Sequence, residues 1–163
     1  MRRERDIGPF LIMGELGRGA MAIVWQAFDR RTKRVVALKE PYFHPNMPER
    51  VIFEMRRRFV SEGKAAARLR HRNIVQIIDA GEWDGHPVIA MELIEGLTLS
   101  NLLATRGALP PREVASILDQ LLDAVGYAHE NGVIHRDIKP ENVFITNDGT
   151  VKLADFGDRK SVV

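Results

Sequence analysis

The stretch "VIHRDIKPENVFITNDGTVKLADFG", residues 133–157, decides the fold of this 163-residue chain. Two runs rich in β-branched and apolar residues, "VFIT" and "TVKLA", flank the turn sequence "NDG", and this pattern predicts a β-hairpin. Asn142 precedes the first strand and Asp155 follows the second. Because a hairpin returns its two ends side by side, the two oxygen ligands should converge on one metal site.

The polar residues just before this hairpin are suited to chemistry on a phosphoryl group. Asp137 can accept or orient a hydroxyl proton, and Lys139 can neutralise a transferring phosphoryl group. Asn142 offers an oxygen ligand suited to Mg²⁺. A lone aspartate or histidine is usually a loop or core residue. Chance is a poor explanation, however, for the ordered cluster His-Arg-Asp-x-Lys-Pro-x-Asn at residues 135–142.

A glycine-bearing turn stands between two predicted strands near the N-terminus. In "LGRGAMAIV", residues 16–24, Gly17 and Gly19 allow a sharp turn and a close approach to a phosphate. An ordinary hairpin turn explains two glycines about equally well, and Ala22 stands where a third glycine would be expected. A strand follows the turn, whereas a dinucleotide-binding fingerprint requires a helix there.

A lysine and a glutamate form a further candidate pair. Alternation along the predicted strand 34–39 puts Ala37 and Lys39 on one face. In the predicted helix 49–70, Glu62 falls on the apolar stripe, where a carboxylate needs a partner. We therefore expect Glu62 to pair with Lys39. The alternative is a solvated lysine and an unrelated glutamate.

The order of the elements predicts an α+β fold: an antiparallel sheet with one helix, followed by a mainly helical part. The clearest helix spans residues 112–130, with an apolar stripe of helical period. The predicted division is 1–94, 95–157 and an atypical tail at 158–163. The other predicted strands are 10–16, 23–28, 74–78 and 88–93, and a short helix is expected at 99–105.

Composition excludes several classes of function. The hydrophobic share of 45%, the charged share of 28% and the net charge of +2 are those of an ordinary globular protein, with no bias toward nucleic acid or membrane. The absence of cysteine excludes disulfides and suits a reducing cytoplasm. No apolar run approaches a membrane span. The basic residues of the helix 49–70 are interpreted as a solvated face, with docking of an anionic partner as the alternative.

Together, these four motifs resemble those of the eukaryotic-type protein kinases, and in particular of their bacterial serine/threonine members. The resemblance runs from about Ile7 to Gly157 and implies a kinase-like fold: a complete N-lobe at 1–94 and the first part of a C-lobe at 95–157. It implies binding of ATP with Mg²⁺ and transfer of the γ-phosphate to a serine or threonine of a protein substrate.

The resemblance also implies a nucleotide site. Leu16 and Val24 would cover the adenine, Met91 looks like the gatekeeper, and Glu92 and Ile94 would offer hinge backbone groups. The full implied set is Leu16, Gly17, Arg18, Gly19, Ala20, Val24, Ala37, Lys39, Met91, Glu92, Ile94 and Phe144.

The catalytic roles follow in the same way. Lys39, paired with Glu62, would hold the α- and β-phosphates, and Asp137 would be the catalytic aspartate. Lys139 would contact the γ-phosphate. The remaining implied roles are Mg²⁺ binding for Asn142 and Asp155, a regulatory stack for His135 and Phe156, and pairing with an activation-loop phosphate for Arg136.

The ending "DRKSVV" departs from the family, which continues with an activation segment and further helices. We interpret it as a truncation, a frameshift or a gene-call boundary. Three functions are compatible with this sequence: a kinase, a pseudokinase-like Mg-ATP-binding module, and a non-functional kinase fragment. Without a later helix, apolar positions of the helix 112–130 should face solvent, which predicts self-association or chaperone binding. We expect a soluble, cytoplasmic chain.

Overall fold

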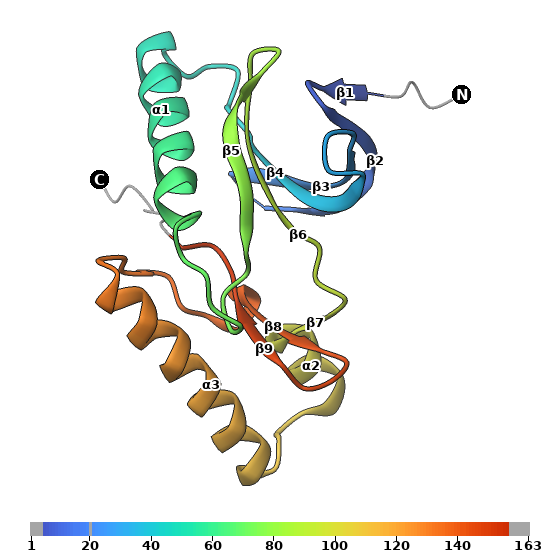
Figure 1. Cartoon of the computed structure of the whole chain (residues 1–163), viewed down its shortest axis with the longest axis vertical. Helices are drawn as coiled ribbons and strands as arrows, with labels where there is room; N and C mark the ends of the chain where they lie inside the picture. The colour runs from blue at the N-terminus through green and yellow to red at the C-terminus, as the bar shows by residue number, and fades with distance from the viewer. Residues whose placement is uncertain (1–4, 20, 157–163) are drawn as a thin grey trace. The chain divides into compact units, whose positions relative to one another are not determined.

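The structure, a computed structural model, describes residues 5–19 and 21–156. The chain divides into two compact units (Figure 1). Within the described ranges, the first comprises residues 5–67, apart from residue 20, and 77–93, and the second comprises residues 68–76 and 94–156. Within the described part of the chain, no helix is long and apolar enough to cross a bilayer.

The first unit is an antiparallel sheet of six strands with one helix. The strand order is β1-β2-β3-β4-β6-β5, and every neighbouring pair is antiparallel. The helix α1 spans Glu49–Ala66. The strands are β1 Arg5–Ile7, β2 Phe10–Arg18, β3 Ala22–Asp29, β4 Arg34–Pro41, β5 Ile77–Trp83 and β6 His86–Glu92.

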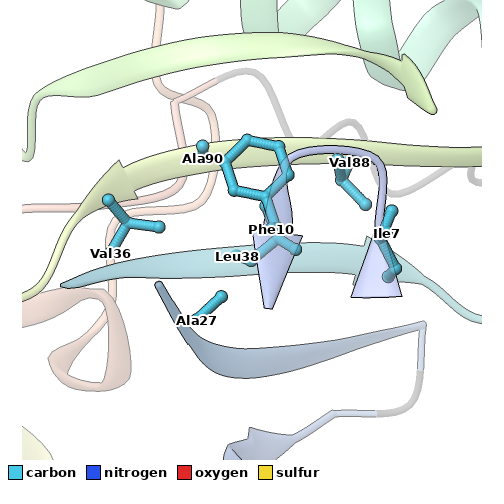
Figure 2. Packing of buried hydrophobic residues seen from close by; sticks show 7 residues of the cluster. All are labelled: Ile7, Phe10, Ala27, Val36, Leu38, Val88 and Ala90. Carbon is cyan, nitrogen blue, oxygen red and sulfur yellow. The ribbon is translucent and has the colours of Figure 1, made fainter. Parts of the chain in front are cut away.

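One face of this sheet buries the core shown in Figure 2. The sheet is curled, because the β1–β2 turn packs against the β5–β6 hairpin. Gly8, with φ of +53°, donates its N–H to Asp84 Oδ2 at 2.7 Å, and a Cβ on Gly8 would lie 2.6 Å from Trp83 Cδ1. Phe10 meets the Trp83 ring edge to face, with centroids 5.4 Å apart. The core residues are Ile7, Phe10, Ala27, Val36, Leu38, Val88 and Ala90.

The second unit combines a three-stranded sheet, in the order β7-β8-β9, with two α-helices. The hairpin predicted from "VFITNDGTVKLA" is present, with Val143 opposite Leu153. The helix α3 lies against β9, and its buried residues are Ile117, Ala124 and Ala128. The elements are β7 Gly96–Thr98, α2 Leu99–Arg106, α3 Pro111–Glu130, the 3₁₀ helix η1 Pro140–Asn142, β8 Val143–Thr146 and β9 Val151–Leu153.

The strand predicted at 74–78 is wrong in its placement. Residues 73–75 pair with β9: Ile74 forms a bridge with Leu153, and the N–H of Val75 donates to the Leu153 carbonyl at 2.9 Å. The strand that joins the first sheet therefore begins later, at Ile77. The helix predicted to reach residue 70 ends at Ala66 for the same reason, since residues 68–76 belong to the second unit.

Candidate functional site

Strand register gathers five of the predicted residues of the first unit on one face of its sheet. Residues directly opposite in an antiparallel pair share a face. Val24 lies opposite both Gly17 and Lys39, and Ala37 lies opposite Met91. These five residues face away from the core, because the intervening residues of β4 belong to the core.

The helix α1 packs on this same face. Ile89 lies opposite Lys39 in the sheet, and Gly63 of α1 packs directly on Ile89, where a Cβ would fall 2.7 Å from Ile89 Cγ1. Glu62 is the residue before Gly63 and is half-buried. The sequence therefore brings the glutamate's helix to the lysine's side of the sheet. The ion pair between Lys39 and Glu62 stays a prediction.

The glycine-rich turn leaves open space where side chains would be. The N–H of Gly19 donates to the Ala22 carbonyl at 2.8 Å and closes the turn. A Cβ on Gly17 would meet nothing within 4 Å, and a Cβ on Gly19 would meet only the Ala22 oxygen at 3.7 Å. Neither glycine has a positive φ, so the fold of the turn does not require them. The space is of the kind that a closely approaching phosphate would fill.

Arg18, between these two glycines, is the last residue of β2 and pairs with Glu15 of the same strand. Its Nε and Nη2 donate to the two carboxylate oxygens of Glu15 at 3.1 and 2.8 Å. This hydrogen-bonded pair lowers the pKa of Glu15 and raises the pKa of Arg18. Leu16 is half exposed, and Ala20 lies outside the described residues.

In the second unit, His135 organises the loop before the hairpin. Its buried ring donates from Nε2 to the Ala154 carbonyl at 2.6 Å and accepts at Nδ1 from the N–H of Asp137 at 3.2 Å. These two partners fit the neutral tautomer with the proton on Nε2. The ring also meets Phe156 edge to face, with centroids 4.7 Å apart. Loop and hairpin are thus joined through one imidazole.

Asp137 and Lys139 form an ion pair in this loop. Lys139 Nζ lies 2.8 Å from Asp137 Oδ2, and this hydrogen bond raises the pKa of Lys139. The lysine therefore remains charged throughout the neutral range. The arrangement places a carboxylate and an ammonium together, a suitable pair for a hydroxyl and a developing phosphoryl charge.

The side-chain amide of Asn142 is held by the loop that precedes it. It is buried, and its Nδ2 donates to the Asp137 carbonyl at 2.9 Å, which fixes the orientation of the amide. No hydrogen bond engages its Oδ1 within the described ranges, so that oxygen is available to a cation. The Asn142 main-chain carbonyl accepts from Ala154 N at 2.8 Å, so Asp155 follows directly after a residue paired with Asn142. The backbone convergence predicted for Asn142 and Asp155 is present.

Two residues of this region have strained backbones. Among the described residues, only four other than glycine have positive φ, and two of them are Arg136 (69°) and Asp155 (61°). Such conformations are costly and concentrate at functional sites. No group of three or more His, Cys, Asp or Glu side chains is poised for a metal in the described part. An asparagine and an aspartate, completed by phosphate oxygens, are nevertheless a suitable donor set for Mg²⁺.

The other residues that the resemblance assigns to the nucleotide are divided between the two units. Met91 and Glu92 end β6 in the first unit, whereas Ile94 follows in the second. Phe144 lies on β8, opposite Lys152 on one side and Thr98 on the other.

Two supporting residues were missed by the sequence reasoning. Gln120 Oε1 accepts from the N–H of Val151 and from Asn73 Nδ2, both at 2.9 Å. Asn73 Nδ2 also donates to the Val151 carbonyl at 2.7 Å. These amides hold the start of β9, the strand that leads to Asp155. The available signal was Gln120 itself, a polar residue on the apolar stripe of its helix.

Comparison with known proteins agrees with this geometry. The profile of the protein kinase domain matches residues 10–162. The serine/threonine-protein kinase PknL of Mycobacterium tuberculosis is 41% identical over 148 residues, which cover 91% of this chain and 36% of PknL. The serine/threonine-protein kinase PrkC of Bacillus subtilis is 40% identical over 154 residues, covering 94% of this chain and 23% of PrkC. The chain therefore spans only about a quarter to a third of these relatives.

Solved structures show the same fold. The crystal structure of the M. tuberculosis PknI kinase domain superposes with a TM-score of 0.83 at 34% identity, covering 98% of this chain and 62% of that domain. The chain belongs to the protein kinase family. Its fold is the kinase fold, with a curled antiparallel N-lobe and part of a C-lobe, as the resemblance implied.

Proposed function

We propose that this chain carries the ATP-handling part of a serine/threonine protein kinase, which transfers the γ-phosphate of ATP to a protein hydroxyl. The observation that carries the proposal is the cluster in the second unit. There Asp137 pairs with Lys139, while a hydrogen bond fixes the amide of Asn142 and no described residue donates to its amide oxygen. Family membership and the kinase names of the relatives support the same reaction.

Each residue of the cluster has a physical task in that reaction. Asp137 orients the acceptor hydroxyl and accepts its proton, and Lys139 balances the charge that develops on the transferred phosphoryl group. Asn142 and Asp155 would hold Mg²⁺, which neutralises the phosphate oxygens when bound. The positions of Asn142 and Asp155 at the two ends of one hairpin keep these ligands together without any contribution from substrate.

The first unit carries residues that would bind ATP in their own right. Gly17 and Gly19 let the backbone approach the phosphates, and Lys39 binds them as a point charge held by Glu62. Val24, Ala37 and the other residues of the implied set line the adenine site. The open space at Gly17 supports this assignment, because no described residue lies within 4 Å of a Cβ at this position.

Phosphoryl transfer tests the proposal directly. The chain is incubated with [γ-³²P]ATP, Mg²⁺ and a basic protein substrate, beside an Asp137→Asn variant. We expect weak transfer by the wild type and at least a hundredfold less by the variant, since a positioned general base contributes about 10²–10⁴-fold. Equal transfer by both chains would exclude this active site.

Nucleotide binding separates a binding-only module from an inert fragment. Thermal unfolding is followed with ATP alone and with ATP and Mg²⁺, and ligand binding should raise the midpoint by mass action. Asp155→Asn should remove the Mg²⁺-dependent increment and leave the increment from ATP alone. A midpoint that does not move with nucleotide in the wild type would identify an inert fragment.

We also propose that the chain self-associates through α3. Val114, Leu118 and Leu122 are spaced one turn apart and are 39%, 51% and 67% exposed. An apolar stripe on one helix face favours association with another apolar surface. Sedimentation velocity measures the outcome.

A further inference from the structure

The exposed face of α1 carries a serine surrounded by cations. Ser61 is exposed, and so are Arg57, Arg58 and Lys64. Residues three and four apart are neighbours on a helix surface. Two arginines therefore lie one turn before the Ser61 hydroxyl and a lysine lies one turn after it.

These three cations differ from the others of α1. Arg50 donates to Glu54 at 3.3 Å, and Arg56 contacts Glu82 and donates to the Gly85 carbonyl. Arg57, Arg58 and Lys64, by contrast, make no ion pair or hydrogen bond with any part of the chain that the structure describes. Three unneutralised cations around one hydroxyl form a surface that an added dianion would satisfy.

We propose that Ser61 is a phosphorylation site whose phosphate is held by Arg57, Arg58 and Lys64. The donor is ATP and the catalyst is a separate serine/threonine kinase that selects arginine before its acceptor. Ser61 Oγ forms a bond to the γ-phosphorus, and the bond from that phosphorus to the β–γ bridging oxygen breaks. ADP departs with the electron pair, and the hydroxyl proton passes to the catalytic carboxylate of that kinase.

The location of Ser61 suits both its recognition by the modifying kinase and the later binding of its phosphate by the three cations. The arginines stand three and four residues before it in sequence, so an extended acceptor segment still presents them to an acidic substrate groove. Ser61 lies in the last two turns of α1, beside Gly63, and glycine lowers the stability of a helix locally. After transfer the helix re-forms, and the phosphate gains charge-assisted hydrogen bonds to side chains one turn away on either side.

Ser116 provides a matched control on another helix. It is also exposed, in the second turn of α3, but two carboxylates and one cation surround it: Glu113 lies three residues before it, Asp119 three after, and Arg112 four before. A phosphate there would meet like charges, which disfavour the dianion. The two serines thus share helical setting and exposure and differ in surrounding charge.

The first experiment measures modification. The full chain is treated with ATP and a purified arginine-directed serine/threonine kinase, and the sites are mapped by mass spectrometry. We expect phosphate on Ser61 and none on Ser116, with occupancy at Ser61 at least tenfold lower in the Arg57→Gln/Arg58→Gln variant. Absence of phosphate from Ser61 overturns the proposal.

The second experiment tests whether Arg57, Arg58 and Lys64 hold the phosphate, independently of how the modifying kinase recognises Ser61. Phosphoserine is incorporated genetically at position 61 or 116, and the phosphate is titrated by ³¹P NMR. The phosphate at position 61 should ionise at lower pH than the phosphate at position 116. Lys64→Gln should raise the pH at which the phosphate at 61 ionises. Lys64 is chosen because it lies after the acceptor, outside the arginine motif that the modifying kinase recognises. If the phosphates at 61 and 116 ionise at the same pH, the proposed binding of the phosphate by the three cations is overturned.

Discussion

Gly63 of α1 lies so close to Ile89 of β6 that a Cβ on the glycine would fall 2.7 Å from Ile89 Cγ1 and 2.8 Å from Ala80 Cβ. The terminal Cδ1 of Ile89 also lies at 2.8 Å, but Ala80 Cβ is fixed by its backbone and Ile89 is buried, so an added methyl group would force α1 or the sheet to shift. We predict that Gly63→Ala destabilises the protein. Overpacking costs about 1–3 kcal/mol, which exceeds the gain of about 1 kcal/mol in helix propensity.

Gly126 of α3 is the control for this prediction. A Cβ on Gly126 would meet no described atom within 4 Å, so Gly126→Ala changes only the helix propensity at that position. Gly126→Ala should therefore stabilise by roughly 0.5–1 kcal/mol. Urea unfolding measures the free energy of unfolding of both variants. A Gly63→Ala variant more stable than the wild type would show that α1 does not pack on β6 as described.

Gly17→Ala separates a ligand role from a folding role. Because the unliganded turn has room for a Cβ at this position, we expect the free energy of unfolding to change by less than about 0.5 kcal/mol. The increase in unfolding midpoint caused by Mg-ATP should fall, since the methyl group occupies space that the phosphates require. Differential scanning fluorimetry with and without Mg-ATP measures both quantities.

Gly14→Ala is the matched variant on the same strand. Gly14 also has open space around it but lies before the glycine-rich turn. Its nucleotide response should match that of the wild type. Equal losses in the two variants would indicate a general effect on β2 and would contradict phosphate binding at Gly17.

The hairpin that carries the candidate site of the second unit was predictable because its geometry is local. One hairpin of known turn chemistry relates Asn142 to Asp155, and the register from Val143 opposite Leu153 follows from the "NDG" turn. The alternation that placed Ala37 and Lys39 on one face is equally local. Such relationships require only the period of a strand and the length of a turn.

Relationships between distant segments were not predictable in the same way. Gly63 looked like a weak point in a helix, because nothing in the sequence shows that Ile89 and Ala80 lie beneath it. Residues 73–75 looked like the start of a strand because they are apolar, yet tertiary pairing with β9 decides their placement. In each case a contact far along the chain overrides the local pattern.

Asp29 should make stability depend on pH in acid. Burial opposes ionisation of this carboxylate, but hydrogen bonds from Arg31 and Thr32 outweigh burial and lower its pKa. The stabilisation is therefore present above the pKa of the unfolded state, near 4, and is lost as pH falls through the lower pKa of the folded state.

Asp29→Asn should remove this dependence. At pH 7 we expect a loss of about 1–3 kcal/mol, because Arg31 loses one of its two charged acceptors and keeps only Asp79, and the difference from the wild type should shrink below pH 4. Asp6→Asn is the control, since the Asp6–Arg30 pair is exposed and should contribute about 1 kcal/mol or less. Urea unfolding between pH 3 and 7 measures the slopes, and parallel curves for Asp29→Asn and wild type would contradict the assignment.

Leu118→Gln/Leu122→Gln should reduce self-association. The two leucines are 51% and 67% exposed on one face of α3, so replacing them removes apolar surface from solvent contact without emptying a core. Glutamine retains helix propensity close to that of leucine, so the helix should persist. Sedimentation velocity should show a shift toward monomer, together with weaker binding of a hydrophobic dye. Leu103→Gln, at an exposed leucine of α2, should change neither measurement. A wild-type chain that sediments as a monomer and binds no dye would rule out α3 as an association surface.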